Sequence, residues 1–206
     1  MTITFYTNPM SRGQIARWAL HEAGADYDQV LLDYGTTMKD DAYLAVNPMG
    51  KVPAIVHDGK IVTECAAICA YLADTFPDAG LAPNDAERAD YYRWLFFAAG
   101  PVESAMAHQM LELHVDSEKE MMLGYGNFDR VIDVLDEKLS NSDYICGDRF
   151  TMADVYVGSH VDWGLAFGTM PERDSFHAYA KRMQDRENYQ SSKAVDNALM
   201  PEEVAS

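Results

Sequence analysis

The sequence predicts an α/β domain followed by an all-helical domain. Residues 2–7 alternate between apolar and polar and suit a short strand, and residues 27–34 suit a second one. Residues 12–23 between them have helical spacing, so the three segments form a crossover unit with parallel strands. Prolines, a glycine and other turn-forming residues gather at 75–87, and the pattern after this stretch is helical. These observations indicate two domains of different class.

The first domain continues with a predicted hairpin. The segments "VPAIV" and "KIVT" flank His57-Asp58-Gly59, and Asp-Gly is a strong signal for a tight hairpin turn. A short helical piece is expected before them, near 38–46, and a longer helix after them, from Glu64 onward. The expected order is therefore β-α-β-(α)-β-β-α over about 75 residues.

The second domain is expected to contain a series of helices. They are predicted at 87–111, 117–140, 151–168 and 175–187, with a polar connection at 140–150. The resulting division is 1–76 for the α/β domain, 77–86 for the linker and 87–206 for the helical domain.

Composition limits the classes of partner and compartment. The 206 residues carry a formal net charge of −17, which repels the phosphates of nucleic acids and of anionic membranes. The three cysteines, Cys65, Cys69 and Cys146, form no Cys-x-x-Cys pair, so a disulfide scaffold and a thiolate zinc site are not expected. No secretory signal or membrane-spanning run is visible, and the reducing cytoplasm is the expected location.

Two segments have the spacing of a helix-capping box. Thr151 and Asp154 are three residues apart before an apolar run, so Thr151 is expected to cap the helix and Asp154 to reach back to the backbone. Ser11 and Gln14 have the same spacing at the start of the first helix. A serine at position 11 therefore has a structural explanation that requires no catalytic role.

Four stretches together resemble the cytosolic glutathione transferases, over essentially the full length of the chain. They are "NPMSRGQIARWALHEAG" at 8–24, "NPMGKVPAI" at 47–55, "TECAAICAYLAD" at 63–74 and "GDRFTMADVYVG" at 147–158. The resemblance implies a thioredoxin-like N-terminal domain and an all-α helical-bundle C-terminal domain. It further implies glutathione as co-substrate, no metal, and a homodimer.

The resemblance assigns a glutathione-binding role to four residues of the first domain. It implies a cis Val52–Pro53 bond, whose outward Val52 backbone groups pair with the cysteinyl part of glutathione like an added strand. Glu64 would pair with the γ-glutamyl ammonium, and Cys65 would receive the carboxylate at a helix N-terminus. The family usually has serine at the second position, and a thiol is a weak donor, so the Cys65 N–H would do most of that work.

Two lysines are candidates for the glycyl carboxylate of glutathione. Lys51 directly precedes Val52, and Lys39 lies in the preceding loop. The alternative for both is an ordinary solvated surface position.

The group that meets the glutathione sulfur remains open in the sequence. Ser11 is the first choice because it follows the strand and precedes the helix, where a donor would stabilise the thiolate. The alternatives are Tyr6, the Asn8 amide, Arg12, and backbone groups between Met10 and Gly13.

The second substrate, a small hydrophobic electrophile, is expected to bind between the domains. Its candidate residues are Met10, Trp94, Met106 and His108. The predicted activity is attack of the glutathione thiolate on this electrophile. The alternatives are a glutathione-dependent reductase or isomerase on the same scaffold, and a non-catalytic glutathione-binding or interaction protein.

Overall fold

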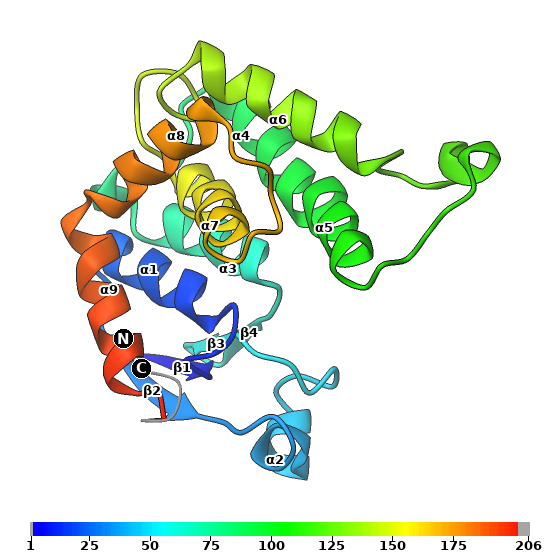
Figure 1. Cartoon of the computed structure of the whole chain (residues 1–206). Helices are drawn as coiled ribbons and strands as arrows, with labels where there is room; N and C mark the ends of the chain where they lie inside the picture. The colour runs from blue at the N-terminus through cyan, green and yellow to red at the C-terminus, as the bar shows by residue number, and fades with distance from the viewer. Residues whose placement is uncertain (1, 202–206) are drawn as a thin grey trace. The chain divides into compact units, whose positions relative to one another are not determined.

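The computed structural model describes residues 2–201, which form two compact units (Figure 1). Unit 1 comprises the residues up to Ala82 together with those from Asp185 onward, and unit 2 comprises Pro83–Gln184. The expected helical domain of 87–206 therefore differs from unit 2 at its end, because the last helix packs with the α/β part of the chain.

Unit 1 is built on a four-stranded sheet of order β2-β1-β3-β4. Strand β1 (Ile3–Thr7) is parallel to β2 (Tyr27–Leu31) and antiparallel to β3 (Ala54–His57), which forms a hairpin with β4 (Lys60–Val62). The mixed sheet and the Asp58-Gly59 hairpin agree with the prediction. The helices of this part are α1 (Gly13–Ala23), α2 (Asp41–Leu44) and α3 (Cys65–Thr75), with 3₁₀ turns at Thr37–Lys39 and Pro77–Ala79.

The alternation along β1 separates the two faces of the sheet. Ile3, Phe5 and Thr7 are fully buried, and Phe5 lies against Arg17 of α1. Tyr6 points to the other face, where it packs on the Tyr43 ring at a centroid distance of 5.3 Å. The face that meets α1 is therefore distinct from the face covered by α2.

The start of α1 differs from the predicted capping box. The Ser11 hydroxyl accepts the Gly13 N–H (2.9 Å) and donates to the Asn8 carbonyl (2.7 Å), whereas the Gln14 N–H donates to the Ser11 carbonyl (3.1 Å). The Gln14 side chain bonds to Pro9 instead of reaching back to Ser11. The box predicted at 11–14 is therefore wrong, because the tight turn after Asn8 brings a different N–H to the hydroxyl. At its other end α1 stops at Gly24 in the left-handed conformation, as expected.

The last helix, α9 (Glu187–Ala198), packs along α1. A buried ion pair joins Arg17 to Asp196 at 2.9 Å, and the Trp18 and Tyr189 rings meet edge to face. The Glu22 carboxylate accepts two bonds from Arg186, at 2.6 and 2.8 Å. These contacts make α9 part of unit 1.

Unit 2 is helical, but two expected helices differ from the prediction. The helix expected at 87–111 consists of α4 (Arg88–Phe97), a π-helical segment (Ala98–Val102) and α5 (Glu103–Met110). Pro101 lies in the π-helical segment, where its ring nitrogen has no hydrogen to donate. The remaining elements are a 3₁₀ turn (Ser117–Met122), α6 (Phe128–Asn141), α7 (Met152–Ala166) and α8 (Asp174–Gln184).

The helix predicted at 117–140 begins only at Phe128. Asn127 caps it, because its side-chain oxygen accepts the Arg130 N–H at 3.0 Å. Gly126 just before the cap has a φ of 74°, which breaks any helical continuation from the preceding turn.

The predicted capping box of α7 is confirmed. The Asp154 carboxylate is fully buried and accepts the Thr151 N–H at 2.8 Å. It also accepts the Ile145 N–H (2.7 Å) and the Tyr179 hydroxyl (2.8 Å). The box therefore joins the start of α7 to the preceding connection and to α8.

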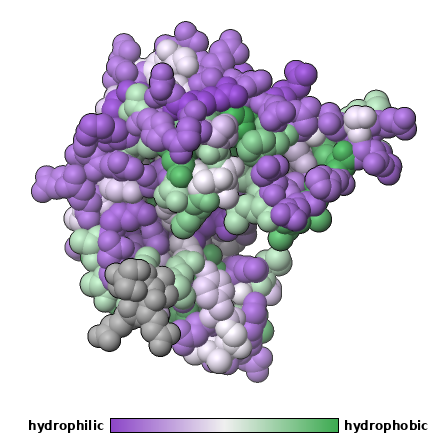
Figure 2. All heavy atoms as spheres, viewed as in Figure 1, coloured by the Kyte–Doolittle hydropathy of each residue, from purple (hydrophilic) through white to green (hydrophobic). Residues whose placement is uncertain are grey.

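Hydrophilic side chains cover most of the surface in view in Figure 2, with hydrophobic residues at the 117–122 turn. Met121 and Met122 in this turn are 89% and 80% exposed. Among the helices of residues 2–201, none has the length and apolar character needed to cross a bilayer.

Candidate functional site

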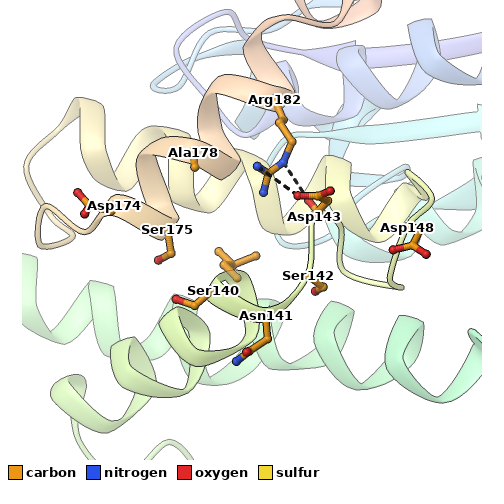
Figure 3. A pocket seen from close by; sticks show the side chains of 10 residues that line it. Ser140, Asn141, Ser142, Asp143, Asp148, Asp174, Ser175, Ala178 and Arg182 are labelled. Atoms are coloured by element: carbon orange, nitrogen blue, oxygen red, sulfur yellow. Dashed lines mark hydrogen bonds and ion pairs between the residues drawn. The ribbon is translucent and has the colours of Figure 1, made fainter.

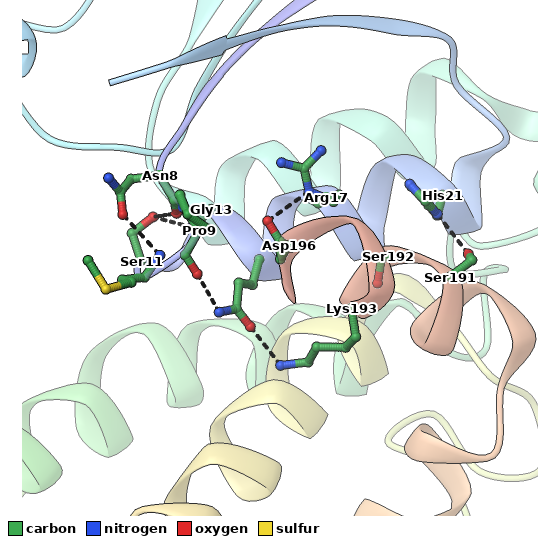
Figure 4. Close-up of polar contacts among 12 residues, drawn as sticks. Asn8, Pro9, Ser11, Gly13, Arg17, His21, Ser191, Ser192, Lys193 and Asp196 are labelled. Atoms are coloured by element: carbon green, nitrogen blue, oxygen red, sulfur yellow. Dashed lines mark hydrogen bonds and ion pairs between the residues drawn. The ribbon is translucent and has the colours of Figure 1, made fainter. Parts of the chain in front are cut away.

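Two Asn-Pro-Met turns frame the candidate site in unit 1. The buried Asn8 accepts the Met10 N–H (2.9 Å) and donates to the Leu32 carbonyl (2.8 Å) (Figure 4). Asn47 repeats this arrangement, accepting the Met49 N–H (3.1 Å) and donating to the Lys51 carbonyl (2.8 Å). Each asparagine thus shapes a tight loop after a regular element.

The second of these turns leads into the Val52–Pro53 bond, which is cis. The Tyr43 hydroxyl also donates to the Lys51 carbonyl, at 2.5 Å, so the backbone before Val52 is firmly placed. Within residues 2–201 no hydrogen bond uses the Val52 N–H or C=O. A backbone donor and acceptor are thus available for an extended ligand.

The starts of α3 and α1 lie at the same end of the sheet as this loop, because Ala54 pairs with Tyr6 near the end of β1 and Ile55 pairs with Val62 at the end of β4. Glu64, directly before α3, has a φ of 63°, which is rare for a residue with a Cβ atom. The Cys65 thiol donates to the Arg12 carbonyl at 3.6 Å, so the first residue of α3 contacts the residue before α1. Two helix N-termini with their partial positive charges therefore lie together, which favours anions. Strained backbone of this kind is often retained at binding sites.

The candidate lysines lie in the same loop region. Lys39 donates to the Gly50 carbonyl at 2.7 Å. Lys51 is exposed and has no ion-pair partner within residues 2–201. Lys39 and Lys51 place two ammonium groups in this loop region of a chain whose formal net charge is −17.

The four candidates for the sulfur contact have different surroundings. The half-buried Ser11 hydroxyl has one donated and one accepted bond, and both Asn8 amide groups have partners in the protein. Tyr6 lies on the α2 face of the sheet, away from α1. The Arg12 side chain is exposed at the start of α1. Ser11 and Arg12 are therefore the candidates whose side chains belong to the α1 start and are not buried.

Thr7 is a polar residue at this site that the sequence reasoning missed. Its hydroxyl is fully buried and has no hydrogen-bond partner within residues 2–201. It lies directly beneath Gly13, where an added Cβ would be 2.0 Å away from the Thr7 oxygen. The alternation of Ile3, Phe5 and Thr7 toward the α1 face was the signal that could have revealed it.

Family models match both parts of this chain. The model for the glutathione S-transferase N-terminal domain matches residues 1–74, and that for the C-terminal domain matches residues 101–187. The chain belongs to the glutathione S-transferase family. Glutathione S-transferase GstA of Escherichia coli O157:H7 is 31% identical over 183 residues, which are 86% of this chain and 90% of that protein.

Solved structures of this family have the same fold. A glutathione transferase from Methylococcus capsulatus is 26% identical, with a TM-score of 0.78 over 95% of this chain and 99% of the other. A sphingomonad glutathione S-transferase complexed with glutathione is 27% identical, with a TM-score of 0.76 over 94% and 98% of the two chains. The expected thioredoxin-like and helical-bundle fold is thereby confirmed.

The electrophile candidates of this glutathione S-transferase are not brought together within either unit. Met10 belongs to unit 1 and is 47% exposed, whereas the other three belong to unit 2. Trp94 is buried and packs on Phe97, so it is a core residue. Met106 is half-buried. His108 contacts the Tyr125 hydroxyl at 2.6 Å and lines a cavity of about 120 Å³.

A larger groove of about 590 Å³ lies elsewhere in unit 2, between the end of α6 and α8 (Figure 3). Polar and charged side chains dominate its lining, and the Arg182 guanidinium bonds to the Asp143 carbonyl at 3.1 Å. None of the predicted site residues lines it. Its character does not suit a hydrophobic electrophile.

Cys146 is the one cysteine of unit 2, and its surroundings do not activate the thiol. Burial raises the pKa of Cys146 to about 11, so this thiol remains protonated and weakly nucleophilic at neutral pH. Among residues 2–201, no three histidine, cysteine or acidic side chains are grouped to hold a metal ion.

Proposed function

We propose that this chain is a glutathione transferase that activates the glutathione thiol for attack on small hydrophobic electrophiles. The observation that carries the proposal is that three features lie at one end of the sheet: the Val52 backbone, the start of α3 and the start of α1. Together they provide strand-like pairing for a peptide, a place for a carboxylate and a place for a thiolate. Membership of the family supports the same ligand.

In this proposal each end of glutathione has its own partners. The Val52 N–H and C=O pair with the cysteinyl part. The Glu64 carboxylate pairs with the γ-glutamyl ammonium, and the N-terminal N–H groups of α3 at Cys65 receive the γ-glutamyl carboxylate. Lys39 and Lys51 attract the glycyl carboxylate. The sequence departs from the family at Cys65, which leaves the carboxylate to backbone donors.

Ser11 is the proposed donor to the glutathione sulfur. Its hydroxyl carries one hydrogen, which the Asn8 carbonyl accepts in this structure. A typical neutral hydrogen bond contributes about 1 kcal/mol, whereas one to a charged group contributes about 1.5–3 kcal/mol. Exchanging the carbonyl for a thiolate is therefore favourable. The Gly13 N–H continues to donate to the Ser11 oxygen and polarises the hydroxyl further.

The proposed reaction begins with loss of the glutathione thiol proton to solvent. The thiolate, stabilised by Ser11 and by the N-terminus of α1, then forms a C–S bond to the electrophilic carbon. In a substitution, a leaving group departs with its electron pair. In an addition to one carbon of an activated double bond, the other carbon of that bond takes up a proton from solvent. Among the electrophile candidates, Met10 adjoins Ser11, and the half-buried Met106 and His108 are the remaining proposals in unit 2.

Isothermal titration with glutathione, followed by ultraviolet titration of the bound thiolate, tests this proposal. Binding together with a thiol pKa below that of free glutathione is the expected result. Absence of binding at millimolar glutathione would overturn it. Binding with an unshifted thiol would instead indicate a non-catalytic module, and disulfide reduction without conjugation in a substrate panel would indicate a reductase.

A homodimer and a cytoplasmic location complete the proposal. The dimer follows from family resemblance, and sedimentation of the purified chain tests it. The location follows from three cysteines without a pairing pattern, which suit a reducing compartment.

A further inference from the structure

A chain of side-chain hydrogen bonds runs from α9 to the loop 8–12. The Lys193 ammonium donates to the Gln14 side-chain oxygen at 2.7 Å, and the Gln14 side-chain nitrogen donates to the Pro9 carbonyl at 2.5 Å. Figure 4 shows this path from α9 through α1 to the turn that contains Ser11. It links residues 179 positions apart in the sequence.

The chemistry of the three groups fixes the direction of this path. A lysine ammonium has donors only, so the Gln14 amide must turn its oxygen toward Lys193. Its NH₂ group then faces Pro9, and a carbonyl is the matching acceptor. Within residues 2–201 the Pro9 carbonyl has no other hydrogen-bond donor. Lys193 thus determines how Gln14 holds the backbone next to Asn8 and Met10.

We propose that Lys193 and Gln14 are positioning residues that hold the loop 8–12 in the geometry that presents Ser11 to the glutathione sulfur. This inference rests on the proposed function. Both the N–H (3.1 Å) and the hydroxyl of Ser11 donate to the Asn8 carbonyl. Asn8 directly precedes Pro9, so a displacement of Pro9 also moves the acceptor that holds Ser11. The C-terminal helix thereby influences the thiol-activating end of α1 without touching the substrate.

The docking of α9 does not depend on this path. The buried Arg17–Asp196 pair, the Glu22–Arg186 contact and the Trp18–Tyr189 packing hold the two helices together separately. Variants that break only the path should therefore fold. Gln14→Met removes both bonds without a change of charge. Lys193→Met removes the ammonium, and with it the bond to Gln14 and the cation–π contact with the Tyr189 ring at 5.5 Å.

Ser191→Ala is the matched control. It removes a bond of 2.8 Å between His21 and Ser191, which joins the same two helices without reaching the loop. Lys193→Arg, which retains a cationic side chain with donors only, is the variant expected to preserve the path.

Two measurements on the full chain test the proposal. Amide hydrogen exchange of Met10 and Ser11, without glutathione, should speed up about threefold or more in Gln14→Met and Lys193→Met but not in Ser191→Ala. The thiolate fraction of bound glutathione at neutral pH should fall about threefold to tenfold in the same two variants, with glutathione affinity changed less. Lys193→Arg should resemble the parent chain in both.

Exchange rates equal to those of Ser191→Ala would overturn the proposal, and so would faster exchange with an unchanged thiolate fraction. If both quantities changed in Gln14→Met but not in Lys193→Met, the role proposed for Lys193 and α9 would be wrong. Failure of the parent chain to bind glutathione or to lower its thiol pKa would count against the proposed function, while the exchange measurement would still report whether the path holds the loop.

Discussion

The Ser11 hydroxyl has one hydrogen to donate. The Asn8 carbonyl accepts it in this structure, and the glutathione sulfur would accept it in the proposed complex. The bond that this hydroxyl accepts from Gly13 shows that the residue also stabilises the turn into α1. Structural and catalytic roles thus share one side chain, and only measurements on bound glutathione separate them.

Replacing Ser11 by alanine tests the catalytic role. We expect kcat/KM for a model aryl halide to fall about tenfold to a hundredfold, because one preorganised donor to the developing charge is lost. The thiolate titration of bound glutathione should move to higher pH. Ser191→Ala should leave both unchanged, and a larger loss in Tyr6→Phe than in Ser11→Ala would contradict the assignment.

Gly13→Ala reverses the usual effect of this substitution in a helix. Alanine normally stabilises a helix by about 1 kcal/mol relative to glycine. Here the new methyl group would lie 2.0 Å from the Thr7 hydroxyl and 2.9 Å from that of Ser11. We expect a loss of about 1–3 kcal/mol in the free energy of unfolding, measured with urea. Adding Thr7→Ala should recover part of the loss, whereas strictly additive effects would rule out the clash.

At the scale of single elements, the start of α7 depends on one buried carboxylate. Asp154→Ala would leave the N–H groups of Thr151 and Ile145 and the Tyr179 hydroxyl without their acceptor. We expect a loss of about 3 kcal/mol or more in the free energy of unfolding, seen as a lower melting temperature. Asp129→Ala, at an exposed position in the first turn of α6, is the control, and equal melting of both variants would contradict the role of the box.

The pairing of α1 with α9 gives a pH-dependent contribution to stability. Burial by itself would raise the pKa of Glu22, but hydrogen bonds from Arg186, Trp18 and Asn188 outweigh it and hold the pKa below its usual value of 4.5. At pH values near and below 4.5, the unfolded chain therefore binds more protons than the folded chain does. The stabilisation is present above about pH 4.5 and is lost as the pH falls through the pKa of the folded state.

Urea unfolding of Glu22→Gln between pH 7 and pH 3 tests this linkage. The deficit in stability relative to the parent chain should be largest at pH 7 and should shrink as the pH falls. Glu187→Gln, an exposed change of the same charge on α9, should show little deficit at any pH. A constant deficit for Glu22→Gln would mean that the carboxylate contributes by packing alone.

At the scale of the whole chain, unit 1 is completed by residues from both ends of the sequence. The Arg17 and Asp196 side chains are 0% and 1% exposed, and they belong to α1 and α9. Arg17 also donates to the Tyr27 hydroxyl at 2.9 Å and lies over the Phe5 ring. Removing α9 would therefore leave the Arg17 guanidinium in unit 1 without its carboxylate partner.

Asp196→Ala should lower the free energy of unfolding by about 3–5 kcal/mol, because Arg17 would remain charged and buried without its partner. The double variant Arg17→Met with Asp196→Leu should be much less destabilised, since apolar residues replace both charges. Urea denaturation of the parent chain, the single variant and the double variant measures both losses in the free energy of unfolding. A double variant as unstable as the single one would show that the tyrosine and phenylalanine contacts of Arg17 matter more than its charge.

Local patterns were sufficient for much of unit 1. The β1 alternation, the Gly24 stop, the Asp58-Gly59 hairpin and the Thr151–Asp154 box each depend on residues close in sequence. At these positions the local preference of the residues agrees with the final fold, so the sequence pattern alone predicts the feature. The residues 47–55 also placed the cis Val52–Pro53 bond correctly, through resemblance.

The amino-acid sequence by itself determined the class of both domains, the family and the segments that meet at the proposed glutathione site. Only the tertiary structure decided the partners of Ser11 and Gln14, the burial of Thr7 and the place of α9. Helical spacing reports which face of a helix is apolar, but it does not report which other element covers that face. The contact between residues 14 and 193 depends on that packing, and so the path from α9 to the loop 8–12 had no signal in the sequence.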